Sequence, residues 1–466
     1  MELLIVPSNI KGLDEAEMSD FQDLLAIYNA HAIKNEEKQK YYEGKIGINE
    51  VNLGIALPEK LKKLQIGCAW GAKTVDVLAA RSMFDGFVGL NGDTIEELTE
   101  IVVNNDLITN YSKATRDELK FGCTFATLSG DPKNGVKIRF HSEMSAAAKW
   151  DGNRGIVKKG FAVVETKQNP NTNLWEASVI NYHTDNAIWV ITNMESYWQA
   201  EKYSHKMGRP LMEALIWNGT TDKPFGRSRL KKPIRDLIDE FIRTMANATI
   251  GLEFATAPQK YLLGVTDDQF DQVVNDKFTQ YVGNIIASTT NPETGEKPSF
   301  GQLQQGTLQP HIDMMRMLST QFSAATGLTV TDTGIVNDAN PTSSDAIDAQ
   351  TKTLVGMAQQ LNTGNGTALK NIALMALAIK NNKSLDELTP EQKAVVAHFK
   401  NPALPSIATT TDAAIKISSV RPEFAQTDMF LEMIGFDIAE IRRIKNQEAQ
   451  SRGLNILEEL GNADQE

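Results

Sequence analysis

Six histidines are the side chains of this chain best suited to metal binding and to proton transfer near neutral pH. They are His31, His141, His183, His205, His311 and His398. A local metal site needs ligands about three to five residues apart, and no two of these histidines are that close. His183 lies with Asp185 in an expected turn between strands, where a surface position explains both better than catalysis does. The histidines therefore predict no metal site and no catalytic pair.

The sequence patterns of phosphate-binding and hydrolytic enzymes do not occur either. The chain has no G-x-x-x-x-G-K-[ST] and no G-x-S-x-G. The string Gly364-Asn365-Gly366 lacks the third glycine of a dinucleotide site and follows a helical pattern. Acidic pairs such as Asp267-Asp268 are adjacent, so on a helix they point apart. We expect a protein that is not an enzyme and that needs no metal or cofactor.

Cysteine content and net charge exclude further classes. Cys68 and Cys123 are the only cysteines, too few for a zinc ribbon or a disulfide framework, and they suit a reducing compartment. The formal charge is −12, from 47 Lys and Arg against 59 Asp and Glu, which argues against a nucleic-acid-binding protein with a basic face. The N-terminus lacks the features of a signal peptide, and the apolar stretch 372–379 is too short to span a bilayer, so we expect no membrane segment.

The first half of the chain is expected to combine helices with an antiparallel sheet. Apolar residues at helical spacing predict helices over 14–43, over a segment with Val75 and Leu78 that ends near Asp85-Gly86, over 94–104 and over 114–121. From about residue 121 apolar and polar residues alternate, and Asn134-Gly135 is a hairpin signal. These alternations predict an antiparallel meander, with strands near 136–140, 160–166, 174–182 and 187–193.

Two helices with an insertion between them are expected in the middle of the chain. An apolar stripe predicts a helix from Lys232 to about Phe254, and Pro310 fits the first turn of the second helix. About 50 residues separate the two, which is too long for a simple connecting loop. The insertion has strand-like stretches and a turn at 291–295. The two helices could run antiparallel, with the insertion at their far end.

The last third begins with a polar loop over 327–341. Thr342 and Asp345 have the spacing of a capping box, which predicts a helix start. The pattern predicts a break in that helix at 362–366 and its return over 369–379. A strand is expected at 413–418, followed by helices near 423–433 and 437–452.

This order of elements and several short strings resemble the portal proteins of tailed double-stranded DNA bacteriophages of the long-tailed, siphophage type. The strongest stretch contains Gln321 to Leu328, with its Thr-Gly after a helix, and Asn340 to Ile347, an "Asn-Pro-x-Ser-x-Asp-Ala-Ile" string. Ala257 to Gly264 resembles the family's proline-containing exit from the first long helix. Tyr41 to Gly44 and Phe84 to Phe87 fit two landmarks near the start. The matching strings span roughly residues 40–350.

The resemblance implies an α+β fold, a portal-like ring subunit with an α/β wing, a two-helix stem, an inserted β-containing clip, a tunnel loop with a long helix after it, and a helical crown. The implied parts are the wing 1–228, the stem helices 229–257 and 306–326, the clip 258–305, the tunnel loop 327–341, the long helix 342–422 that returns to the wing, and the crown 423–466.

The function implied is a ring at one capsid vertex, usually of twelve copies, through which double-stranded DNA is packaged and ejected without sequence specificity. Implied partners are further copies of the chain, the major capsid protein and scaffold, the large terminase subunit, and a head-completion adaptor or neck protein. The implied location is the portal vertex of the virion, and the host cytoplasm during assembly.

Three groups of residues follow as candidate sites. The tunnel loop would present Thr329, Val330, Thr331, Asp332, Ile335, Val336 and Asp338 to DNA, and it contains no Lys or Arg. A basic cluster at the first stem helix, Arg227, Arg229, Lys231, Lys232 and Arg235, could meet DNA phosphate or an acidic neighbouring subunit, or could be a solvated helix start. The clip would dock its partners through a tip of Asn291, Pro292, Glu293, Thr294 and Gly295.

Other functions remain open from the sequence. Another phage structural protein, such as a capsid or scaffolding protein, is the first alternative. A capsid subunit would lack the helix–insertion–helix order at 229–326, and a scaffold would be largely helical and rich in charge. A phage enzyme acting on nucleic acid is the second, and it would need the metal or phosphate site that the sequence lacks.

Overall fold

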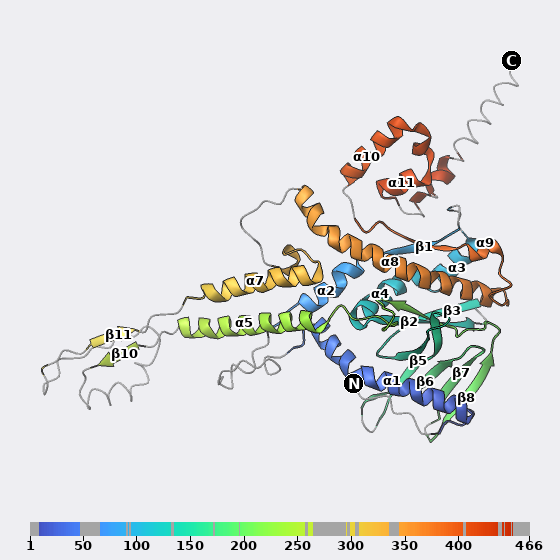
Figure 1. The fold of residues 1–466 in the computed structure, drawn as a ribbon, viewed down its shortest axis with the longest axis horizontal. Coiled ribbons are helices and arrows are strands. Elements are labelled where there is room, and N and C mark those ends of the chain that lie inside the picture. The colour runs from blue at the N-terminus through green and yellow to red at the C-terminus, as the bar shows by residue number, and fades with distance from the viewer. Residues whose placement is uncertain are drawn as a thin grey trace, which may run out of the picture.

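The computed structural model shows a mixed α/β body, a projecting two-helix arm and a small group of C-terminal helices (Figure 1). The residues it describes are 9–46, 66–89, 92, 95–131, 135–170, 173–194, 196–256, 260–263, 295, 299–302, 307–334, 344–403, 407–436, 440–441, 443–448 and 450. Within these residues no helix is long and apolar enough to cross a membrane.

Helix α1 (Glu15–Glu43) packs on a five-stranded antiparallel sheet. Asp14 caps its start and Gly44, in the left-handed region, ends it, so the helix expected over 14–43 is confirmed. The sheet is a true meander whose strands follow chain order: β4 (Ala146–Asp151), β5 (Ile156–Gln168), β6 (Trp175–His183), β7 (Ala187–Asn193) and β8 (Trp198–Ser204). Phe21 of α1 packs between the rings of Phe161 and Tyr182, so the helix and the sheet share one apolar core.

A second, three-stranded sheet has the order β3-β2-β9 and lies against helices α4 and α8. The strands are β2 (Cys123–Asp131), β3 (Gly135–Ser142) and β9 (Met212–Ile216). Strand β9 follows the five-stranded meander in the chain but pairs with β2, which precedes it. The strands that the sequence predicted as one meander therefore belong to two sheets. Helix α3 (Glu96–Asn104) confirms the helix expected over 94–104, and α4 (Leu107–Phe121) contains the helix expected over 114–121 but begins earlier, at Leu107.

The predicted end of the second helix near Asp85 is wrong. Helix α2 spans Trp70–Ala79, and Phe84–Val88 is a strand, β1. Strand β1 pairs antiparallel with β12 (Val396–Phe399). Because β1 and its partner strand are more than 300 residues apart, the local pattern of this apolar stretch could not distinguish a helix end from a strand.

Helix α5 (Lys232–Thr256) and helix α7 (Gln309–Thr326) lie side by side and form the arm (Figure 1). Both confirm the expected helices, and Pro310 sits in the first turn of α7. Beyond them, β10 (Lys260–Leu263) pairs antiparallel with β11 (Ser299–Gln302). Of the strand-like stretches expected in the insertion, 261–263 belongs to β10, and 281–287 lies outside the described residues.

Helix α8 (Ser344–Lys380) is continuous, so the predicted break at 362–366 is wrong. Asn365 is fully buried at this point, and its amide donates to the Tyr111 hydroxyl at 3.0 Å and to the Glu118 carboxylate at 2.8 Å. Both partners belong to α4. Tertiary packing therefore offsets the weak helix propensity of the Gly-Asn-Gly string.

The predicted strand at 413–418 is also wrong, because this stretch belongs to helix α10 (Ile407–Val420). The β-branched residues favoured a strand, but a helix satisfies its own backbone hydrogen bonds, and α10 packs against α11 (Asp428–Ile434). The short helix η4 (Pro422–Gln426) lies between α10 and α11, and all described residues between 440 and 450 are helical, as expected. The short helix α9 (Pro390–Lys393) belongs to the body, where it contacts α8.

His183 does not have the surface position expected of it. It ends β6 with its side chain fully buried, and burial lowers its pKa to about 3, so the ring is neutral. Among the described residues, no group of three or more histidine, cysteine or acidic side chains could hold a metal ion.

Candidate functional site at the base of the two-helix arm

The arm meets the body at a joint built from four helices. Each arm helix carries apolar residues every three or four positions, and these form a single stripe on its surface. Ile234, Ile238 and Ile242 of α5 and Leu318 and Phe322 of α7 are buried in one cluster with residues of α2 and α8. The same spacing that makes the helices amphipathic therefore fixes them to each other and to the body.

Trp70 is the centre of this joint. Its indole ring lies 4.1 Å from the ring of Phe241 in α5 and 4.4 Å from that of Phe322 in α7, measured between centroids. Its Nε1–H donates to the carbonyl oxygen of Thr333 at 3.1 Å. One side chain of α2 thus contacts both arm helices and the loop that follows them.

Arg229 ties the start of the arm to two other elements. Its Nε donates to the Thr74 carbonyl at 2.7 Å and its Nη2 to the Thr326 carbonyl at 2.8 Å. Thr326 ends α7, where a cation is favoured by the helix dipole. Arg229 is buried, and burial lowers its pKa to about 10, so the guanidinium keeps its charge at neutral pH. The residue joins α2, α7 and the start of α5.

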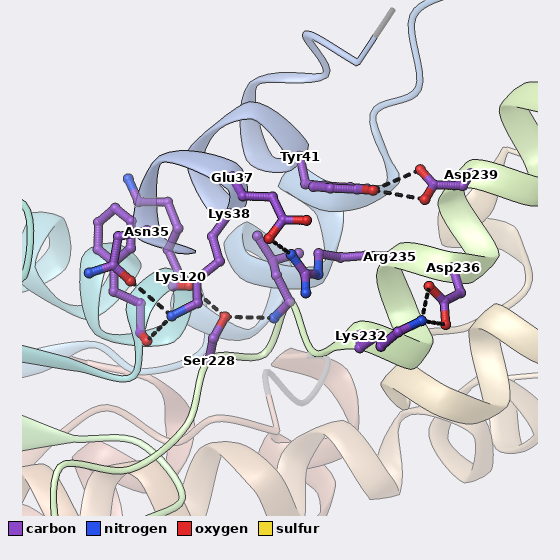
Figure 2. A network of polar contacts seen from close by, with 12 residues as sticks. Asn35, Glu37, Lys38, Tyr41, Lys120, Ser228, Lys232, Arg235, Asp236 and Asp239 are labelled. Carbon is purple, nitrogen blue, oxygen red and sulfur yellow. Dashed lines mark hydrogen bonds and ion pairs between the residues drawn. The ribbon is translucent and has the colours of Figure 1, made fainter. Parts of the chain in front are cut away.

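A second brace links α1 to α5 (Figure 2). The Tyr41 hydroxyl donates to the Asp239 carboxylate, 2.9 Å from Oδ1 and 2.8 Å from Oδ2. Burial and the bond to Asp239 raise the pKa of Tyr41, so the phenol stays protonated. Arg235, one turn before Asp239 on α5, pairs with Glu37 of α1. These contacts hold the first two turns of the arm against the body.

Behind this brace, α1 is fixed to the end of α4. Lys38 Nζ donates to the Asn35 side-chain oxygen and to the Phe121 carbonyl, both at 2.9 Å. Burial lowers the pKa of Lys38. Asn35 in turn donates to Glu143 at 2.9 Å, and the Ser228 hydroxyl donates to the Lys120 carbonyl. Residues 228 and 229, through which the chain enters the arm, are therefore hydrogen-bonded to α4 as well as to α2 and α7.

The basic cluster expected at this point divides into two kinds of residue. Arg229 is buried, Arg235 pairs with Glu37, and Lys232 Nζ lies 2.9 Å from Asp236 of its own helix. The remaining two cations, Arg227 and Lys231, are exposed. Three of the five charges thus have partners within the chain.

The described part of the expected tunnel loop is a compact turn. Gly327 ends α7 in the left-handed region, and Leu328 is buried. Asp332 accepts hydrogen bonds from the Thr329 amide at 2.9 Å and the Thr329 hydroxyl at 2.8 Å. Val330 precedes the short helix η3 (Thr331–Thr333). The Asp332 carboxylate is therefore held by its own turn.

Most of the other predicted site residues lie outside the part of the chain that the structure describes. Ile335, Val336, Asp338, Thr342 and the tip residues Asn291 to Thr294 are outside the described residues. Gly295 is exposed with a φ of +71°, which suits a turn. Helix α8 begins at Ser344, so the cap by Thr342 and Asp345 stays a prediction.

Sequence reasoning missed Trp70 and Tyr41 as parts of the joint. Their partners come from helices far along the chain, and no local spacing connects them. Gly71 offers one signal after the fact: a Cβ added there would lie 2.1 Å from the Tyr41 carbonyl, so the α1–α2 contact requires glycine.

No protein-family model and no curated protein matches the chain. Among solved structures, it is similar to a chain in the virion of a native gene transfer agent particle, with 12% identity, a TM-score of 0.45, and coverage of 76% of this chain and 86% of that chain. A chain in the neck of an empty particle, computed with C6 symmetry, gives 11% identity, a TM-score of 0.45 and the same coverage. A chain in the neck of a native particle, computed with C12 symmetry, has 11% identity and a TM-score of 0.43, and the match covers 79% of this chain and 89% of that chain. Likeness at this level carries no functional conclusion.

Proposed function

We propose that this chain is the subunit of a closed ring, most simply of twelve copies, which forms the portal of a tailed double-stranded DNA virus particle. The observation that carries the proposal is the braced arm: two antiparallel helices, α5 and α7, project from an α/β body and enclose an inserted segment. This order supports a stem with an inserted clip, the arrangement that the family resemblance implies. The body then corresponds to the wing, and the C-terminal helices correspond to the crown.

The joint supports a structural role in place of a catalytic one. Its charges are used to hold helices together, as in the contacts of Arg229, Arg235 and Tyr41. A subunit that must keep its shape while DNA moves past it needs such a rigid base. Capsid or scaffolding proteins are the alternative, and no contact in the described residues favours them over a portal.

The net charge suits a channel that DNA passes through without being held. Each Lys or Arg contact to a phosphate releases counterions and is favourable, so many of them would trap the duplex. A charge of −12 on each subunit gives a ring with a strongly negative field, which keeps DNA mobile.

The first test is the mass and shape of the purified protein. Native mass spectrometry with negative-stain imaging should give a ring with a central hole and a mass near a multiple, expected to be twelve, of 51.4 kDa. A protein that stays monomeric at high concentration and across salt conditions contradicts the proposal. Shell fragments or rods instead of rings would indicate a capsid or scaffolding protein.

The insertion between the arm helices is the proposed docking surface, first for the large terminase subunit and later for the head-completion adaptor. Deleting Asn291 to Lys297 should leave rings intact and abolish binding of these partners in a pull-down with purified components. Loss of ring formation would show that the segment holds subunits together instead.

A further inference from the structure

The C-terminal helical unit, defined as residues 407–434, rests on the body without sharing its core. Figure 1 shows α10 and α11 together, above α8 and β1. Among the residues that the structure describes, none of the four apolar clusters includes a residue of this unit. Its attachment to the body must therefore come from other contacts.

A cavity of about 550 Å³ lies where the unit meets strands β1 and β12. Met83 and Phe399 line it from the body, Phe424, Met429 and Met433 line it from the unit, and Phe436 lines it just after the unit ends. This hollow is partly open to solvent, so side chains do not fill the space between the two surfaces there, and the methionines of its lining tolerate more than one arrangement. The apolar part of the contact is thus loose.

Charged side chains cross the same boundary. His398 of β12 stands between two carboxylates: its Nδ1 lies 3.7 Å from Asp85 Oδ2, and its Nε2 lies 3.8 Å from Glu432 Oε1. Asp85 belongs to β1, whereas Glu432 belongs to α11. Lys400 Nζ lies 3.8 Å from the other Asp85 oxygen. The residues that α10 and η4 contribute to the cavity lining, Thr410 and Phe424, carry no charge.

This setting favours the protonated imidazole. The pKa of His398 is raised, chiefly by its contact with Asp85, and Glu432 acts in the same direction. Burial and the Lys400 charge oppose the shift. Only Glu432 would leave with the helical unit, because Asp85, His398 and Lys400 all belong to the body.

We propose that His398, held between Asp85 of the body and Glu432 of α11, is a proton-operated latch that fixes the C-terminal helical unit to the body. When His398 is charged it bridges the two carboxylates. When it is neutral, the ionic bridge to Glu432 is lost, while Lys400 stays beside Asp85 within the body, and the loosely packed unit separates more readily.

The direction of the pH dependence follows from linkage. Docking brings Glu432 to His398 and raises its pKa, so the docked state binds a proton more tightly than the undocked state. Docking is therefore strongest where His398 is charged, and it weakens as the pH rises through the raised pKa of His398. This inference does not depend on the ring function, because it concerns two parts of one chain.

The test is hydrogen exchange of the backbone amides of α10 and α11 in the full-length protein, at pH 6 and pH 9. Wild type and variants are compared at the same pH, so that the intrinsic pH dependence of exchange cancels. Glu432→Gln should raise exchange roughly two- to fivefold at pH 6 and leave it unchanged at pH 9. His398→Gln should give the same result.

Glu423→Gln is the matched control, because Glu423 is an exposed carboxylate of the same unit and does not contact His398 in the structure. It should exchange like wild type at both pH values. An equal effect of Glu432→Gln at pH 6 and pH 9, or no effect at either, overturns the latch. Since the Glu432 side chain is 41% exposed, this variant tests the proposal even if His398→Gln fails to fold.

Discussion

At the scale of single residues, Arg229 shows how a cation can look like a ligand-binding residue in the sequence and serve the fold in the structure. Its guanidinium is buried and bonds to two backbone carbonyls from different helices. Arg227, two residues earlier, is exposed. The sequence identifies a basic cluster here, but the partners Thr74, Thr326 and Glu37 come from other elements, so it cannot separate the two kinds of cation.

Replacing Arg229 by Met should lower the free energy of unfolding by about 2–4 kcal/mol, because two buried carbonyls lose their donors. The measurement is the urea midpoint, read with the slope of the transition. Arg227→Met is the control and should stay within about 0.5 kcal/mol of wild type. Equal effects of the two substitutions would mean that burial at the joint contributes nothing.

Glu118 makes a second residue-scale prediction through its titration. Burial raises its pKa to about 8, while the unfolded chain has the ordinary value near 4.5. Between these values the folded state binds the extra proton, so this group's contribution to stability is complete below about pH 4.5 and is lost as the pH rises toward 8. The free energy of unfolding of Glu118→Gln, relative to that of wild type, should therefore be higher at pH 8 than at pH 5.

The measurement is the difference in urea midpoint between wild type and Glu118→Gln at each pH, in which other titrating groups cancel. Glutamine keeps an oxygen that can accept the hydrogen bond from Asn365. A variant that is equally destabilised at both pH values would show that Glu118 is ionised in the folded protein.

At the scale of elements, helices with a long apolar stripe could be predicted from the sequence, whereas elements that depend on distant partners could not. Helices α1, α5 and α7 appear where their periodicity places them. Strand β1 was missed because it is defined by pairing with β12. The break predicted in α8 failed because Asn365 is held by Tyr111 and Glu118 of α4, a contact that no window of sequence contains.

Replacing a glycine within α8 and the glycine that caps α7 by alanine should change the free energy of unfolding in opposite directions. Gly364 is exposed within α8, and a Cβ added there would meet nothing closer than the Ile216 carbonyl at 3.9 Å. Gly364→Ala should therefore stabilise by about 0.5–1 kcal/mol, which is the difference in helix propensity.

Gly327 is the matched contrast, since it caps α7 with a φ of +72°. An added Cβ would lie 2.4 Å from the Met357 methyl. Gly327→Ala should destabilise by about 1–2 kcal/mol, the cost of the left-handed region for a residue with a side chain. Thermal unfolding of the two variants beside wild type checks both signs, and a stabilised Gly327→Ala would contradict the observed cap.

At the scale of the whole molecule, net charge governs assembly. Bringing together subunits that each carry −12 costs electrostatic repulsion, and salt screens it. The Debye length falls from about 30 Å at 0.01 M to about 10 Å at 0.1 M. The fraction of protein in rings should therefore rise over this range, as measured by mass photometry or sedimentation. Rings that fall apart as salt is added would instead indicate an interface held by ion pairs.

The hairpin at the arm's far end has a further consequence. Lys260 pairs with Gln302, so the chain leaves the arm and returns to it at neighbouring points. A sequence inserted between β10 and β11 would therefore have its two ends held close together, and added length there would cost the folding of the rest little entropy. The joint at Trp70 and Arg229 lies at the opposite end of both helices. The arm is thus a natural acceptor for exchanged or foreign sequence: a domain grafted there would be displayed away from the body, and related proteins could diverge in their partners while keeping one scaffold.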